Sequence, residues 1–333
     1  MNTKILDATE SNENVQIAAD VIRAGGLVAF PTETVYGLGC DAFNAEAARK
    51  VYAAKGRPSD NPMIVHIARA SDIGALTPQI STDFVRLADT FWPGPLTMVL
   101  RKKAEVPDVT TGGLSTVAVR LPDDPVALAL IRAADCPVAA PSANLSGGPS
   151  PTKAEHVIRD LSGRVDVILT GFDSRIGIES TVLDLTSDIP TILRPGILAN
   201  YQLAAILGRE VIYDPALLAG RTLDGTPKAP GMKYEHYAPK AQMLVVAGEQ
   251  DKVRAEIERL KGLNERLGSA VGVILFEERA YVEAAHDFYA RLRALDGEGV
   301  DLILAGALND TDSVGFAVMN RMLKSAGYKV VNV

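Results

Sequence analysis

Two segments of the chain place charged, amide and hydroxyl side chains directly beside an apolar run. Residues 31–37 (PTETVYG) follow the apolar run 27–30 and supply hydroxyls, a carboxylate and a phenol. Residues 55–62 (KGRPSDNP) form a proline-stiffened loop that offers an ammonium, a guanidinium and an amide. Charge-assisted hydrogen bonds of roughly 1.5–3 kcal/mol each would hold a polyphosphate there. The alternative is that the two cations only complement the dipole of a preceding helix.

Further polar residues follow other apolar runs. Residues 141–148 (PSANLSGG) are small enough to let backbone N–H groups approach a ligand, and they lack the G-x-S-x-G pattern of a serine hydrolase. Residues 177–181 (GIEST) and 193–196 (LRPG) add a hydroxyl and a guanidinium, although each could be an ordinary turn. His66 lies in an apolar run, where a structural role and a functional one are about equally expected. Together these segments predict one polar cleft for an anion and a small polar molecule.

Several classes of site are excluded or disfavoured. The chain has no Gly-Lys pair, which excludes a P-loop. Residues 37–42 match G-x-G-x-x-A, but polar residues separate them from the preceding strand, which disfavours a dinucleotide site. Cys40 and Cys136 have no metal-ligand spacing and are expected to be reduced structural thiols. A net charge of -7 disfavours an extended nucleic-acid footprint, so we expect no strong direct binding of nucleic acid.

Strands and helices alternate along the chain, as in an α/β protein. In the first 211 residues we expect strands at 27–30, 63–67, 96–100, 117–121, 138–140, 165–169 and 182–185. Asn44 should cap a helix that runs to residue 54, and Thr152 with Glu155 has the spacing of a capping box. Near the C-terminus we expect strands at 243–246, 270–276, 301–304 and 330–333, with helices at 250–266, 284–294 and 312–326.

This pattern predicts two α/β domains. We expect a catalytic domain at 1–211, a linker at 212–240 that is rich in proline and glycine and could act as a lid, and a small parallel Rossmann-like domain at 241–333. No stretch approaches the 18 continuous apolar residues of a membrane span, and the first ten residues have no apolar leader segment. We therefore expect a cytoplasmic protein.

The motifs closely resemble those of the YrdC-type threonylcarbamoyl-AMP synthases. They are PTETVYGLG, KGRPSDNPMIVHI, FWPGPLT, VAVRLP, APSANLSGGPSPT, GIESTV, LRPG and PGMKYEHYAP. The resemblance spans about residues 20–240, and the rest resembles the extra C-terminal domain of the longer members. It implies a twisted mixed-sheet domain of the YrdC type. It also implies formation of L-threonylcarbamoyladenylate and pyrophosphate from L-threonine, bicarbonate or CO2, and ATP, the first step of threonylcarbamoyladenosine formation in tRNA.

The resemblance also implies roles for individual residues. Its K-x-R and S-x-N signature falls on Lys55, Arg57, Ser142 and Asn144, which would carry catalysis. The L-threonine site would be lined by Thr34, His66, Arg120, Ala140 and Ser180. ATP would be held by Arg57, Asn61, Thr116, Ser142, Ser150, Arg194 and Tyr237. Without an evident carboxylate cage, Mg²⁺ would be held mainly by the ATP phosphates and water rather than by protein ligands.

Two other functions stay open. The chain could be an RNA-binding module, which its acidic charge and 5% aromatic content disfavour. It could also be another carbamoyl-adenylate-forming enzyme, but the relatives of that kind carry zinc fingers, for which two cysteines are too few. If it is the synthase, its product would pass to the machinery that transfers threonylcarbamoyl to tRNA.

Overall fold

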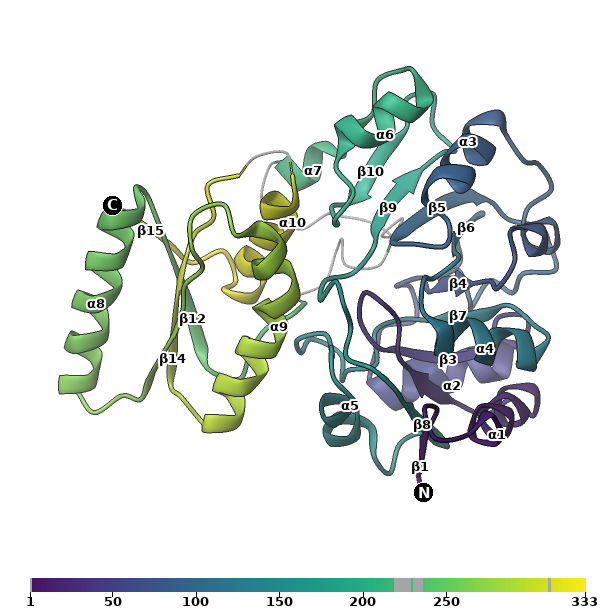
Figure 1. Cartoon of the computed structure of the whole chain (residues 1–333), viewed down its shortest axis with the longest axis horizontal. Helices are drawn as coiled ribbons and strands as arrows, with labels where there is room; N and C mark the ends of the chain where they lie inside the picture. The colour runs from purple at the N-terminus through teal and green to yellow at the C-terminus, as the bar shows by residue number, and fades with distance from the viewer. Residues whose placement is uncertain (1, 219–228, 230–235, 311–312) are drawn as a thin grey trace.

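The computed structural model describes residues 2–218, 229, 236–310 and 313–333. Figure 1 shows two lobes, each built on its own sheet. We call residues 2–218 the N-terminal lobe and residues 242–333 the C-terminal lobe. The fold is therefore the predicted α/β arrangement of a large mixed sheet followed by a small parallel one.

The large sheet belongs to the N-terminal lobe and has the strand order β1-β8-β2-β3-β7-β4-β6-β5-β9-β10-β11. Its strands are β1 Lys4–Asp7, β2 Val28–Phe30, β3 Gly37–Asp41, β4 Ile64–His66, β5 Leu96–Arg101, β6 Thr116–Arg120, β7 Val138–Ala140, β8 Val167–Thr170, β9 Thr181–Asp184, β10 Thr191–Arg194 and β11 Ile212–Tyr213. The sheet is mixed, since β4 runs parallel to β6 and antiparallel to β7. This pairing places the C-terminal ends of β4 and β6 side by side, next to the first residue of β7.

Both faces of this sheet are buried, which explains why its strands are continuous apolar runs rather than alternating ones. In β2, Ala29 enters one apolar core while Val28 and Phe30 enter the other. The helices that cover the faces are α1 Asn12–Arg23, α2 Ala45–Lys55, α3 Thr82–Phe91, α4 Pro125–Ala134, α5 Ala154–Leu161 and α6 Asn200–Leu207, with the short η1 Ala70–Ala75 and α7 Pro215–Leu218.

Helix α2 begins where the sequence predicts. The Asn44 side chain accepts hydrogen bonds from the backbone N–H groups of Glu46 and Ala47, both at 3.1 Å. The helix ends at Gly56, whose φ of +63° turns the chain into the loop that begins with Arg57. Capping at both ends therefore fixes where this basic loop lies.

The predicted capping box of α5 is wrong. The helix begins at Ala154, and the residue at its cap position is Lys153, which makes no capping hydrogen bond through its side chain. The backbone N–H of Thr152 instead donates to Nδ1 of His156 at 3.3 Å. The imidazole supplies a local acceptor that the spacing rule does not consider.

The segment 37–42, which matches a dinucleotide fingerprint, is strand β3 up to Asp41 and not a phosphate-binding turn. β3 pairs with β2 and β7 inside the sheet. A Cβ atom at Gly39 would lie 2.6 Å from Cγ1 of Val138 and 2.7 Å from the Phe30 ring. Glycine is required there for close packing of strands, so the dinucleotide site is excluded.

The C-terminal lobe contains a parallel sheet with the order β13-β14-β12-β15. Its strands are β12 Gln242–Ala247, β13 Val271–Ile274, β14 Leu302–Gly306 and β15 Val330–Asn332, and its helices are α8 Gln250–Arg266, α9 Tyr281–Glu298 and α10 Val314–Ser325. Helix α8 covers the outer face, while α9 and α10 lie between the sheet and the N-terminal lobe (Figure 1). The predicted strands and helices of this lobe are all present.

The two lobes touch closely. Val35 and Ile178 of the N-terminal lobe belong to the same apolar cluster as Phe288 of α9. Gly177 has a φ of +83°, and a Cβ atom there would lie 2.3 Å from the carbonyl oxygen of His286. The backbones of the lobes therefore meet at a point that admits only glycine.

The segment between the lobes is described in part. β11 pairs with β10, so the large sheet reaches two residues into the expected linker. Much of the predicted lid, residues 219–228 and 230–235, lies outside the described residues. No helix in the described part is long and apolar enough to cross a membrane. Cys40 and Cys136 are both free, and burial raises the pKa of each thiol to about 12.

Candidate active site

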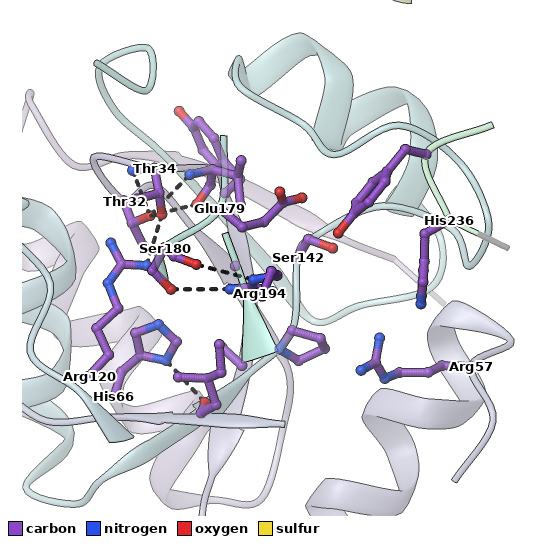
Figure 2. A pocket seen from close by; sticks show the side chains of 17 residues that line it. Thr32, Thr34, Arg57, His66, Arg120, Ser142, Glu179, Ser180, Arg194 and His236 are labelled. Carbon is purple, nitrogen blue, oxygen red and sulfur yellow. Dashed lines mark hydrogen bonds between the residues drawn. The ribbon is translucent and has the colours of Figure 1, made fainter. Parts of the chain in front are cut away.

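A polar pocket lies where several strands of the large sheet end, beside the chain at 236–237. Nine of the residues predicted for the site line it: Thr34, Arg57, His66, Arg120, Ala140, Ser142, Ser180, Arg194 and Tyr237. Figure 2 shows Arg120, His66 and Thr34 at one end, Arg57 and His236 at the other, and Arg194, Ser142 and Glu179 between them. The pocket therefore has two chemically distinct ends.

The first end is organised around Arg120, the last residue of β6. Its guanidinium donates through Nη1 to Oγ1 of Thr34 at 2.8 Å and through Nε to the carbonyl of Gly94 at 3.2 Å. Its Nη2 lies 2.6 Å from Oε1 of Glu33, a buried ion pair. These partners fix the planar guanidinium, which can bind a carboxylate through two parallel hydrogen bonds.

His66 closes this end as a neutral imidazole. Its Nδ1 donates to the carbonyl of Ile64 at 3.1 Å, which leaves Nε2 as an acceptor. Burial, together with the nearby Arg120 charge, lowers the pKa of His66 to about 3. The ring can accept a hydrogen bond from a substrate hydroxyl and carries no charge at neutral pH.

Arg194 and Ser180 stand between the two ends. Nη2 of Arg194 donates to Oγ of Ser180, and its Nε donates to the Ser180 carbonyl, both at 3.1 Å. The Ser180 hydroxyl also lies 2.7 Å from that of Thr97 on β5. Arg194 is 6% exposed, so it presents a cation held in place at the middle of the pocket.

Arg57 forms the second end. Its Nε and Nη2 donate to the carbonyls of Asn61 and Pro62 at 3.2 and 3.0 Å. Burial lowers the pKa of Arg57 to about 10, so the guanidinium is still charged at neutral pH. Neither amide atom of the buried Asn61 side chain has a hydrogen-bond partner, although this side chain does not line the pocket.

Lys55 lies behind the pocket wall rather than on it. Its ammonium donates to the carbonyls of Ser142 and Asn144, and burial followed by the Arg57 charge lowers its pKa well below the ordinary value. The Ser142 hydroxyl donates to Oδ1 of Asn144 at 2.6 Å, and Nδ2 of Asn144 donates to the Gly148 carbonyl at 2.8 Å. The K-x-R and S-x-N residues thus brace one another, with Arg57 and Ser142 facing the pocket.

Glu179 is a pocket residue that the sequence did not single out. Its carboxylate accepts hydrogen bonds from the hydroxyls of Ser150 and of Tyr289, and from Nε of Arg321 at 3.1 Å. Burial alone would raise the pKa of Glu179, but Arg321 and Arg194 outweigh it and hold the pKa below its ordinary value. The sequence signal that could have identified Glu179 is the position of a carboxylate directly before the predicted site residue Ser180.

His236 is a second missed residue, although it lies in the quoted motif beside Tyr237. The Tyr237 ring packs 5.5 Å from that of His236 and 5.5 Å from that of Tyr289. The next residue, Ala238, donates its backbone N–H to the carbonyl of Gly147 at 2.8 Å. The described end of the expected linker is therefore fastened to both lobes beside the pocket.

Five predicted residues do not line the pocket. Lys55, Asn144 and Ser150 bind residues of its wall, and Asn61 lies in the Arg57 loop. Thr116 lies at the start of β6, at the opposite end of that strand from Arg120. Among the described residues, no group of three or more histidine, cysteine or carboxylate side chains gathers to hold a metal ion.

Comparison with known proteins identifies both parts of the chain. A family model described as "Telomere recombination", for Sua5, YciO and YrdC proteins, matches residues 20–196. A second, described as "Threonylcarbamoyl-AMP synthase, C-terminal domain", matches residues 200–327. Threonylcarbamoyl-AMP synthases of Pyrococcus abyssi and Bacillus subtilis are 47% and 45% identical to the chain, over 99% of it and 100% of their own lengths.

A solved structure is similar over the whole chain. The crystal structure of P. abyssi Sua5 complexed with L-threonine superposes with a TM-score of 0.94 at 45% identity, covering 100% of both chains. The similarity thus includes both lobes and their relative arrangement.

Proposed function

This chain belongs to the Sua5/YrdC family of threonylcarbamoyl-AMP synthases, and from that premise we propose that its pocket joins L-threonine, a one-carbon species and ATP. Its activity is that of the family, a transferase reaction that forms an adenylate. The observation that carries the assignment to this pocket is the pair of opposed arginines, Arg120 and Arg57, with Arg194 between them (Figure 2). Full-length similarity to the synthases favours this function over an RNA-binding module or another carbamoyl-adenylate enzyme.

L-Threonine binds at the Arg120 end. The guanidinium pairs with the substrate carboxylate, and Nε2 of neutral His66 accepts a hydrogen bond from the substrate hydroxyl. Thr34, Ser180 and Ala140 complete this end. A single methyl group separates threonine from serine, and apolar contact with one methyl is worth only about 1–3 kcal/mol. We therefore expect measurable use of serine at high concentration.

ATP binds as its magnesium complex at the Arg57 end, with Arg194 and Ser142 near the phosphates. Asn61 offers its unpartnered amide, and Tyr237 reaches the nucleotide from the segment between the lobes. Because Glu179 is the only carboxylate among the described lining residues and already has three partners, the metal is carried mainly by phosphate and water.

The reaction needs no protein nucleophile. The threonine amine attacks CO2, or bicarbonate with loss of hydroxide, and loses a proton to give a carbamate. A carbamate oxygen then attacks the α-phosphorus of ATP, and pyrophosphate leaves. Catalysis consists of holding the two substrates in line while Arg57 and Arg194 offset phosphate charge.

The product is a labile mixed anhydride that a tRNA-modifying transferase consumes. The tRNA that receives the group makes the cytoplasm the expected compartment. The net charge of -7 favours transfer of the small product over direct capture of tRNA by this chain.

The test is to incubate the protein with Mg²⁺, ATP, bicarbonate and L-threonine, to follow pyrophosphate, and to determine the mass of the nucleotide product. Release that requires every component, with the mass of threonylcarbamoyl-AMP, is the expected result. Release without threonine or bicarbonate would contradict the proposed reaction.

A further inference from the structure

The C-terminal lobe sends two polar side chains into the wall of the pocket. Tyr289 of α9 donates its hydroxyl to Glu179 at 3.1 Å, and Arg321 of α10 donates its Nε to the same carboxylate at 3.1 Å. Nη1 of Arg321 also donates to the carbonyl of Pro195, directly after the pocket residue Arg194. Both side chains are fully buried. A carboxylate of one lobe is thus held by the other lobe.

Glu179 occupies a position where its orientation matters. It lines the pocket together with Arg194 and Ser142, between the end that holds Arg120 and the end that holds Arg57 (Figure 2). The bond between the carbamate oxygen and the α-phosphorus must form between those ends. A negative group there sets the local charge and the room left for both substrates.

We infer that Tyr289 and Arg321 are positioning residues for this reaction, which act by fixing Glu179 in the wall of the pocket. The C-terminal lobe is then a part of the active site and not only an appended domain. This inference rests on the proposed function of the pocket.

Alternative partners for Glu179 in the N-terminal lobe are few. Ser150 donates to Oε1, and the Arg194 charge lies near, but Nε and Nη2 of Arg194 donate to Ser180. Loss of Arg321 would leave Oε2 with the Tyr289 hydroxyl, at 3.2 Å, as its hydrogen-bond partner. A buried carboxylate that loses its cation rotates toward another partner or takes up a proton, and either change alters the pocket.

The experiment compares Arg321→Met and Tyr289→Phe with two matched controls. Arg293→Met removes another buried arginine of the same interface, which binds Asp160 and the Pro149 carbonyl but no pocket-lining residue. Tyr281→Phe removes a hydroxyl of the same helix that donates to the Asn309 carbonyl inside the C-terminal lobe. Threonine- and ATP-dependent pyrophosphate release by the unmodified protein is the reference, and its absence would count against the proposed function instead.

We expect kcat to fall about 10- to 100-fold in Arg321→Met and about 3- to 10-fold in Tyr289→Phe, because misplacement near the reacting atoms costs rate more than binding. The KM values for threonine and ATP should change less than about threefold. Both controls should keep kcat within about twofold of the unmodified protein. Equal losses of kcat in Arg321→Met and Arg293→Met, or unchanged kcat in both test variants, would overturn the inference.

A pH profile separates positioning from loss of structure. Glu179 is faced by Arg194 of β10, by Arg321 and Lys324 of α10, by Tyr289 of α9, and by His236 and Tyr237. Removing Arg321 removes a charge that lowers the pKa of Glu179, so the acid limb of kcat should move to higher pH in Arg321→Met. The shift should be absent in Arg293→Met and in the double variant Glu179→Gln with Arg321→Met. An acid limb that stays where it is in Arg321→Met would contradict the positioning role.

Discussion

Buried charged side chains serve different purposes in the two lobes. In the N-terminal lobe most of them gather around one pocket, with Arg57, Arg120 and Arg194 on its wall, while Asp124 and Asp184 make local hydrogen bonds elsewhere. In the described part of the C-terminal lobe the buried charged residues are Arg293 and Arg321, and both bind atoms of the other lobe. Burying a charged side chain without partners is costly, so a buried charge indicates a functional or structural role at that place. The buried arginines of the N-terminal lobe face the pocket where substrates would bind. Those of the C-terminal lobe bind atoms of the N-terminal lobe.

The strongest test of this contrast is Arg57→Met. The loss of two charge-assisted hydrogen bonds to phosphate, each worth roughly 1.5–3 kcal/mol, should lower kcat/KM for ATP at least about 100-fold in the pyrophosphate assay. The matched control is Arg49→Met, an exposed arginine of α2, the helix that precedes the Arg57 loop, where it pairs with Glu46. If kcat/KM for ATP in Arg57→Met stays within threefold of the unmodified value, this end of the pocket does not bind the nucleotide.

An intermediate effect is expected at the contact between the lobes. Gly177→Ala adds a methyl group 2.3 Å from the His286 carbonyl at a φ of +83° and should lower the free energy of unfolding by about 2–3 kcal/mol. Gly299→Ala is the control, since its φ is +72° but nothing lies within 4 Å of the added atom, and it should cost about 1 kcal/mol. Urea titrations measure both. Equal losses of unfolding free energy in the two variants would mean that the lobes are not in close contact at Gly177.

A third prediction is that stability falls in acid, because the folded protein keeps several buried histidines neutral. Burial lowers the pKa of His66 to about 3 and that of His156 to about 4, and it also lowers the pKa of His236, between the lobes, to about 3. Below pH 6.5 the unfolded chain takes up protons that the folded chain refuses, so stability should fall as pH drops toward 4, by roughly 1 kcal/mol per pH unit for each histidine. Trp92 is the single tryptophan and lies in the N-terminal lobe, so its fluorescence reports that lobe.

A matched variant identifies the source of this acid sensitivity. His66→Gln should flatten the pH dependence of urea midpoints followed by Trp92 fluorescence. An unchanged slope between pH 6.5 and 4 would show that His66 is protonated in the folded protein, contrary to its buried, neutral state.

Sequence could predict the pocket because its residues follow local signals. Thr34, Arg57 and Ser142 each follow a strand or helix that apolar periodicity or capping residues mark, whereas Arg194 was singled out only by the segment 193–196. The strands of the C-terminal lobe were also predictable, since β-α-β units leave a regular pattern. Four strands of the large sheet were not predicted. β1 is short and partly exposed, β3 contains two glycines, and β10 and β11 have only four and two residues.

The partners of Glu179 could not be predicted in this way. Arg321 follows it by 142 residues, and Tyr289 by 110, in a different lobe. No local pattern encodes such a pairing, because it depends on how two finished domains dock. The role of Lys55 was hidden for a similar reason, since an ammonium that holds two carbonyls has the same sequence signature as one that binds a phosphate.

The order of strands in the large sheet also bears on how the chain is made. β1 pairs in parallel with β8, so that Lys4 lies opposite Val167, and β5 pairs with β9. At about 5–20 residues per second, a ribosome needs roughly 8–30 seconds after making β1 before β8 exists. Until then the edge of β2 that β8 covers is open to other strands. The N-terminal lobe is therefore the part of this protein most in need of protection during synthesis, since Lys4 and its partner Val167 are 163 residues apart, against 85 for Val245 and Val330 in the C-terminal sheet.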